Sequence, residues 1–114
     1  MVIKTIVDGE EFRIERRLKL LTLPIKRKWF NMIVNGEKKE EYRDIKPYYT
    51  ARFPGTFDSF PVMFRNGYSK NSPSCIALCR LKVGKGRPEW GAEPGKNYYI
   101  LEIIKVEEVR NEKL

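Results

Sequence analysis

The sequence predicts a small α+β fold, in which a mixed β-barrel of five or six strands carries one short helix after an early strand. Three observations predict this class: apolar or alternating runs of strand length recur along the chain, one stretch has helical spacing, and Gly/Pro-rich segments separate them. A chain of 114 residues is expected to form one domain. Residues 1–16 are expected to form a hairpin appended to the core fold.

The N-terminal part is predicted to contain a hairpin and a strand. Residues 2–14 contain two strand-like runs separated by Asp8-Gly9, a dipeptide typical of tight hairpin turns. Residues 18–23 are predicted to form the next strand, with apolar side chains at most positions.

The clearest element is a helix over residues 27–35. Trp29, Met32 and Ile33 are spaced i, i+3 and i+4, so they share one face of this helix. Because its partners at helical spacing are apolar, Trp29 is expected to anchor the core rather than to stack on a nucleobase. Gly36 stands where a left-handed C-terminal cap is expected.

A charged strand is predicted next, over residues 39–45. Alternation places Glu41 and Arg43 on one face, and Glu40 and Tyr42 on the other. The face with Glu41 and Arg43 points either into a barrel or to solvent, and the sequence alone leaves both orientations open.

The second half of the chain is predicted to be mainly strands. An ordered loop with a turn of helix is expected at 46–61, and a flexible basic loop at 84–88. Further strands are predicted at 61–66, 75–83 and 98–106. The last of these is apolar on both faces, which favours a position in the middle of a covered sheet.

The charge of the chain favours an anionic partner. The formal net charge is +8, and the excess of basic residues lies before residue 97. A surplus of this kind is typical of small domains that bind nucleic acid, although a solubilising surface would look similar. No apolar run approaches the roughly 18–20 residues of a membrane span, and no secretory signal is evident, so a cytoplasmic protein without membrane contact is expected.

The residue types exclude several chemistries. The chain has no histidine, which excludes Ser-His-Asp and Cys-His catalysis. Cys75 and Cys79 lie about 13 Å apart along a strand, too far for a disulfide, so both are expected to be free thiols in the core. Without histidine or a third cysteine they lack partners for a metal site, and neither a metal nor a cofactor is predicted.

The segment from Ile25 to Arg43 contains the most specific pattern. It places Ile-Lys at the helix entry, then Trp with Ile four residues later, then Gly-Glu-Lys, then Glu-Tyr-Arg. This order and spacing resembles the ASCH family, small PUA-like β-barrels associated with RNA. The resemblance covers roughly residues 18–106 and implies a cleft formed by Lys26, Lys38, Glu41 and Arg43. In such a cleft a glutamate between cations stays ionised and orients them toward phosphate or a base edge.

The resemblance and the charge together predict a monomeric module that binds RNA or another nucleic acid. The predicted nucleic-acid-binding residues are Lys26, Lys28, Lys38, Arg43, Arg80, Lys82, Lys85, Arg87 and Trp90. Those from residue 80 onward form a basic run beside an aromatic ring, a combination that suits a phosphate backbone and a stacked base. An ordinary charged turn is the alternative for each of them. Aromatic residues at 48, 49, 64 and 68, with Arg65, are expected to line a groove or to fill the core.

An enzyme is the alternative function. Some ASCH relatives hydrolyse N4-acetylcytidine, a modified nucleoside, with a lysine after the turn glycine, a threonine three residues on and a downstream glutamate. Lys38 matches the lysine, whereas Glu41 occupies the threonine position, and Glu89 and Glu102 are the candidates for the glutamate. Lys38 and Glu41 are therefore the candidate catalytic residues, for this hydrolysis or for ribonuclease action. A protein-interaction domain is a third hypothesis, which no sequence feature favours.

Overall fold

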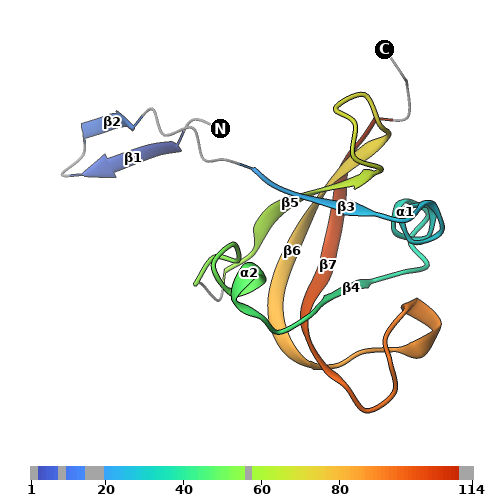
Figure 1. Cartoon of the computed structure of the whole chain (residues 1–114). Helices are drawn as coiled ribbons and strands as arrows, with labels where there is room; N and C mark the ends of the chain where they lie inside the picture. Colours follow the sequence, from blue (N-terminus) through green and yellow to red (C-terminus); the bar gives the residue numbers. More distant parts are fainter. Residues whose placement is uncertain (1–2, 8–9, 15–19, 56–57, 111–114) are drawn as a thin grey trace.

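The computed structural model describes residues 3–7, 10–14, 20–55 and 58–110 of the chain (Figure 1). The strands are β1 (Ile3–Val7), β2 (Glu10–Ile14), β3 (Leu21–Ile25), β4 (Glu40–Arg43), β5 (Phe60–Asn66), β6 (Ser74–Lys85) and β7 (Asn97–Arg110). The helices are α1 (Arg27–Val34), α2 (Pro47–Thr50) and a 3-10 turn, η1 (Pro88–Trp90). The fold is therefore α+β, with two long strands, β6 and β7, and short helices.

The prediction of an N-terminal hairpin is confirmed by the pairing of its two strands. Strands β1 and β2 form a separate antiparallel two-stranded sheet, with Val7 opposite Glu10. The predicted turn at Asp8-Gly9 lies outside the described residues.

The main sheet has five strands in the order β3-β5-β6-β7-β4. Strand β3 pairs parallel to β5, and the other neighbours are antiparallel, so the sheet is mixed. Strand β7 lies inside the sheet, as its two apolar faces predict. Strands β3 and β4 are its two edges, so hydrogen bonding among the described strands does not close it into a barrel.

Several predicted boundaries move in the structure. Strand β4 ends at Arg43 instead of residue 45, and β7 continues to Arg110 instead of residue 106. Of the strand predicted at 18–23, positions 18 and 19 lie outside the described residues. The strand begins at Leu21 and continues to Ile25, because Pro24 sits on an edge where a missing N–H breaks no ladder hydrogen bond. The prediction of a flexible loop at 84–88 is wrong for the first two of these residues. Gly84 and Lys85 continue β6, where they pair with Tyr98 and Asn97.

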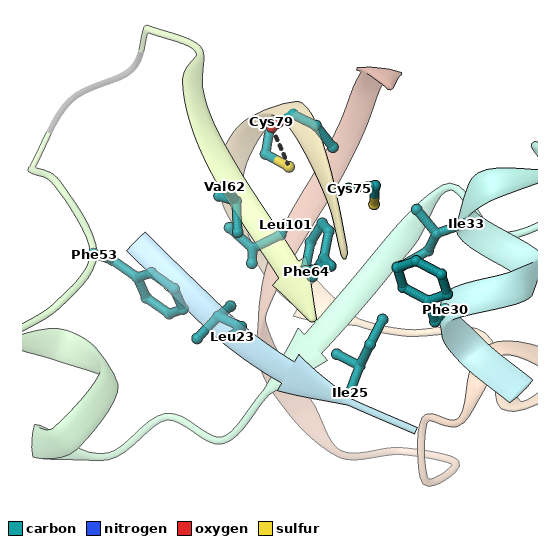
Figure 2. Close-up of a cluster of buried hydrophobic side chains, with 11 residues drawn as sticks. Leu23, Ile25, Phe30, Ile33, Phe53, Val62, Phe64, Cys75, Cys79 and Leu101 are labelled. Carbon is teal, nitrogen blue, oxygen red and sulfur yellow. Dashed lines mark hydrogen bonds between the residues drawn. The ribbon is translucent and has the colours of Figure 1, made fainter. Parts of the chain in front are cut away.

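The core lies on one face of the sheet, with α1 on one side of it and Phe53, from the segment after α2, on the other (Figure 2). Phe30 and Ile33 supply the helix contribution, at 2% and 1% exposure. The prediction that Trp29 anchors the core is wrong, because Trp29 is only half-buried and belongs to neither buried cluster. The buried stripe is centred on Phe30 and Ile33, which leaves Trp29 at its margin.

The turn after α1 matches the predicted glycine cap and positions the next residues. Gly36 adopts φ 86°, and its N–H donates to the carbonyl of Ile33 at 3.2 Å. The N–H of Lys38 then donates to the carbonyl of Met32 at 2.9 Å. The chain thus doubles back over the last turn of the helix, and Lys38 enters the interior just before β4 begins.

The two cysteines are buried free thiols, as predicted. Cys75 is 1% exposed and Cys79 is 0% exposed, and both belong to the main core cluster. Burial raises the pKa of Cys75 to about 11 and the pKa of Cys79 to about 12, from 9.0 for an ordinary thiol. The thiols therefore stay protonated in the folded protein at pH values where they ionise in the unfolded chain.

We expect these thiols to make the protein less stable at alkaline pH. Their folded pKa values lie above the unfolded value, so their contribution is complete below pH 9.0 and is lost as the pH rises toward 11 and 12. At pH 10.5 the loss is expected to be about 2 kcal/mol per thiol. Urea unfolding of wild type and of Cys75→Ala/Cys79→Ala at pH 8 and pH 10.5 measures it. An equal pH dependence in the two proteins would contradict the prediction.

Candidate functional site

The orientation of β4, left open by the sequence, places Glu41 and Arg43 toward the interior. Glu41 lies opposite Leu101 and is 7% exposed, and the Arg43 side chain is 13% exposed. Glu40 and Tyr42 lie on the outer face, where Tyr42 packs with Tyr98, Ile100 and Ala92. An acidic and a basic side chain thus enter the molecule side by side.

Lys38 is a fully buried lysine with three acceptors. Its Nζ donates to the carbonyl oxygens of Glu40 at 2.6 Å and Trp90 at 2.7 Å, and lies 3.2 Å from Glu41 Oε1. Its ammonium also lies over the rings of Trp29 and Tyr42, at 5.1 and 4.8 Å. Burial lowers the pKa of Lys38, and the attraction of Glu41 partly offsets this effect. Three acceptors match the three N–H bonds of an ammonium, so this group is fully engaged.

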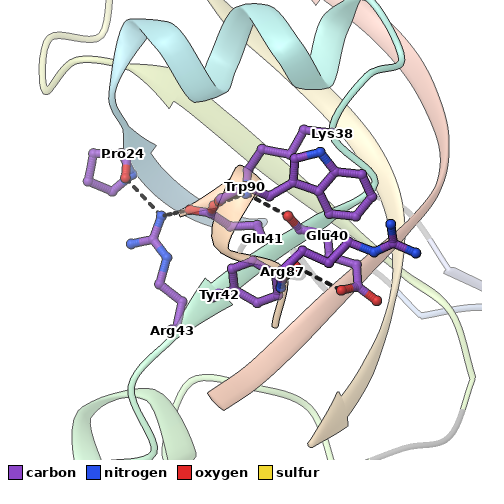
Figure 3. A network of polar contacts seen from close by, with 8 residues as sticks. All are labelled: Pro24, Lys38, Glu40, Glu41, Tyr42, Arg43, Arg87 and Trp90. Carbon is purple, nitrogen blue, oxygen red and sulfur yellow. Dashed lines mark hydrogen bonds and ion pairs between the residues drawn. The ribbon is translucent and has the colours of Figure 1, made fainter. Parts of the chain in front are cut away.

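Glu41 links Lys38 to Arg43 (Figure 3). Its second oxygen, Oε2, accepts from Arg43 Nη2 at 2.7 Å. The same Nη2 donates to the carbonyl of Pro24 at 3.0 Å, and Nη1 donates to the Tyr49 hydroxyl at 3.3 Å. Burial alone would lower the pKa of Arg43, but Glu41 and Tyr49 outweigh it and raise that pKa. The guanidinium is therefore held as a fixed cation.

The contacts from Lys38 through Glu41 and Arg43 to Pro24 join the two edges of the sheet. Arg43 belongs to β4 and Pro24 to β3, so a side chain spans the place where no strand pairing occurs. Arg43 Nε is buried and has no hydrogen-bond partner among the described residues. A buried donor without an acceptor costs about 1–3 kcal/mol. Because this nitrogen is buried, a ligand would reach it only if the Arg43 side chain moved.

A cleft of about 460 Å³ opens beside this chain, between β3, α1, β4 and the end of β5. We call it the Trp29 cleft. Its lining includes Lys26, Trp29, Glu41, Arg43, Asn66 and Tyr68. Lys26 is exposed at its rim, and Tyr68 is 89% exposed. The cleft thus combines two cations, a carboxylate and two aromatic rings.

The structure brings only some of the predicted site residues together. Lys26, Glu41 and Arg43 line the Trp29 cleft, whereas Lys38 lies behind it and is not part of its lining. Lys28 is exposed, and its ammonium lies 4.7 Å from the centre of the Trp29 ring.

The basic run from residue 80 lies on the other face of the sheet. Arg80 and Lys82 alternate with the core-facing Cys79 and Leu81, so their side chains point away from the core. Arg80 pairs with Glu102 at 3.6 Å, and Lys82 pairs with Glu40 at 2.8 Å and with Glu102 at 2.9 Å. These acidic partners offset much of the charge that was predicted to meet phosphate.

At the end of the basic run, Arg87 and Trp90 make contacts within the protein. Arg87 stacks over the Trp90 ring at 4.9 Å, and the Trp90 carbonyl is an acceptor for Lys38. Lys85 is exposed near the end of β6. Trp90 therefore contributes to the support of the buried lysine, and the run from 80 to 87 does not reach the Trp29 cleft.

Several lining groups escaped sequence reasoning. The Pro24 carbonyl is a backbone atom, which no side-chain pattern reveals. Asn66 comes from the far end of β5 and reaches the site only because β5 pairs with β3. Of the aromatics expected in a groove or in the core, Tyr68 lines the Trp29 cleft and Phe64 is fully buried.

Comparison with protein-family models, with curated proteins and with solved structures finds no match for this chain. The described part of the chain contains no helix with the length and apolar character needed to cross a membrane. Within residues 3–7, 10–14, 20–55 and 58–110, no group of three or more Cys, Asp or Glu side chains is arranged to hold a metal ion.

Proposed function

We propose that the chain is an RNA-binding module of the ASCH type, with a PUA-like arrangement of its sheet, and that RNA binds in the Trp29 cleft. The observation that carries this proposal is the fixed guanidinium of Arg43, held by Glu41 and Pro24 in the wall of a cleft that also presents Lys26 and Trp29. Glu41 and Pro24 take both Nη2 donors and Tyr49 takes one Nη1 donor, which leaves one N–H of Nη1 and the positive charge for a phosphate or a base edge.

The aromatic walls support a nucleic-acid ligand over a simple anion. Trp29 and Tyr68 line the cleft, and stacking on aromatic rings contributes to the binding of unpaired bases. The cleft volume also lies in the roughly 300–1,000 Å³ range of small-ligand sites. Because Arg43 is already ordered by its protein contacts, binding costs little additional side-chain entropy.

The contacts of Lys38 weigh against the hydrolase alternative. A lysine acts as a base or nucleophile through its neutral amine, whose lone pair must face the substrate. Here three acceptors surround the ammonium, and Lys38 does not line the Trp29 cleft. A role in support of Glu41 and of the η1 segment fits this geometry better than proton transfer.

We expect Lys26→Ala to weaken binding of single-stranded RNA and to reduce its salt dependence. Removing one phosphate contact is expected to lower the slope of log K against log salt by about 0.7. Fluorescence anisotropy with labelled RNA between 50 and 200 mM salt measures both quantities. Lys105→Ala is the matched control, because Lys105 is exposed on β7 and outside the cleft. Equal loss in both variants, or salt-independent binding in wild type, would contradict the proposal.

A further inference from the structure

A second cleft lies directly beside the Trp29 cleft. It has a volume of about 440 Å³ and is lined by residues 20–24, Arg43, Tyr48, Tyr49 and Arg52. We call it the Tyr48 cleft. Both clefts include Pro24 and Arg43 in their walls. The hydrogen bond between Arg43 and the Pro24 carbonyl therefore lies at the boundary between the two clefts.

The second cleft repeats the chemistry of the first. Tyr48 is 53% exposed, and the Arg52 guanidinium stacks over its ring at 3.6 Å while donating to its carbonyl at 2.7 Å. Tyr49 packs against Phe53 of the core, with ring centres 5.8 Å apart, so the base of the cleft is anchored. An aromatic ring and a cation are therefore offered on each side of Arg43.

We propose that the two clefts are consecutive nucleotide subsites, and that Arg43 holds the phosphate between them. This inference rests on the proposed function and narrows its ligand to single-stranded RNA of two or more nucleotides. Stacking on Trp29 or Tyr68 in one cleft and on Tyr48 in the other requires unpaired bases, which a duplex does not offer. Nη1 of Arg43 donates to Tyr49 through only one of its two N–H bonds, so a second N–H remains for a phosphodiester oxygen at this boundary.

The test separates ring stacking from charge and each cleft from the other. Labelled decauridylate is titrated into wild type, Lys26→Ala, Tyr48→Ala and Tyr48→Phe, after circular dichroism has confirmed that each variant is folded. Tyr48→Ala is expected to weaken binding at least about fivefold, the lower end of the loss of one base–aromatic stack. Tyr48→Phe keeps the ring and is expected to bind like wild type. A duplex of decauridylate with decaadenylate is expected to compete weakly.

Short competitors test whether the two subsites adjoin. Diuridylate is expected to displace the probe from wild type more strongly than uridine monophosphate, and Tyr48→Ala is expected to remove most of this advantage. If Lys26→Ala weakens binding and Tyr48→Ala does not, the second subsite is refuted while the proposed function stands. If wild type binds no RNA, both proposals fail. If only Tyr48→Ala weakens binding, RNA occupies the Tyr48 cleft alone, which refutes both the Trp29 cleft as the RNA site and the pair of subsites. Duplex competition as strong as that of the single strand would refute the single-strand inference.

Discussion

Replacement of Lys38 by methionine is expected to destabilise the protein by about 3–5 kcal/mol, the usual result of removing one partner of a buried ion pair. Methionine fills similar space but leaves the carbonyls of Glu40 and Trp90 and one oxygen of Glu41 without their buried donor. Urea unfolding at neutral pH measures the change in the free energy of unfolding. The change is expected to be among the largest for any single residue of the site.

The neighbouring Lys39→Met substitution is the matched control. Lys39 is exposed, so its replacement is expected to change the free energy of unfolding by less than about 0.5 kcal/mol. In a double-mutant cycle, Lys38→Met and Glu41→Gln are expected to be non-additive, because the two side chains are in contact. Additive effects, or equal effects of the two lysine substitutions, would show that Lys38 does not support the fold in this way.

Arg43→Lys is expected to weaken RNA binding about tenfold or more although it preserves the charge. The guanidinium contacts Glu41, Pro24 and Tyr49 from two nitrogens, and one ammonium cannot reproduce this planar arrangement. Loss of one hydrogen bond to a charged group is worth roughly 1.5–3 kcal/mol, which corresponds to about ten- to a hundredfold in affinity. Anisotropy titration at fixed salt, on protein shown to be folded, measures the effect.

Arg80→Lys provides the comparison for a cation outside the clefts. Arg80 pairs with Glu102 on the outer face, and its side chain is 55% exposed, so its replacement by lysine is expected to leave RNA affinity unchanged. If Arg43→Lys also binds like wild type, charge alone accounts for binding and the fixed geometry of Arg43 is irrelevant. If Arg80→Lys is the weaker binder, the RNA site lies on the outer face.

Local patterns predicted most of the individual elements. Helical spacing and Gly36 located α1 to within one residue, and the two apolar faces of β7 predicted its place inside the sheet. The distance along a strand between Cys75 and Cys79 predicted free thiols. These features are determined by interactions between residues close in sequence, so a short stretch of sequence is enough to predict them.

Features that depend on packing were predicted less well. The helical stripe through Trp29 differs from the buried one through Phe30 by one residue, and only the position of the sheet determines which of them faces the core. The same holds for β4, whose alternation has two equivalent orientations. The buried Lys38 provides the cation that makes an inward Glu41 tolerable, but its burial depends on Trp90, 52 residues away.

The sequence by itself determined the α+β class, the order of the elements and a basic chain without histidine chemistry. Local propensity, turn residues and composition are sufficient for these properties. Only the tertiary structure decided that Lys26, Glu41 and Arg43 share a cleft, that Lys38 lies behind it, and that Arg80 and Lys82 lie on the opposite face. The physical reason is that the desolvation of charged groups is compensated by partners distant in sequence, and only the pairing of strands brings those partners together.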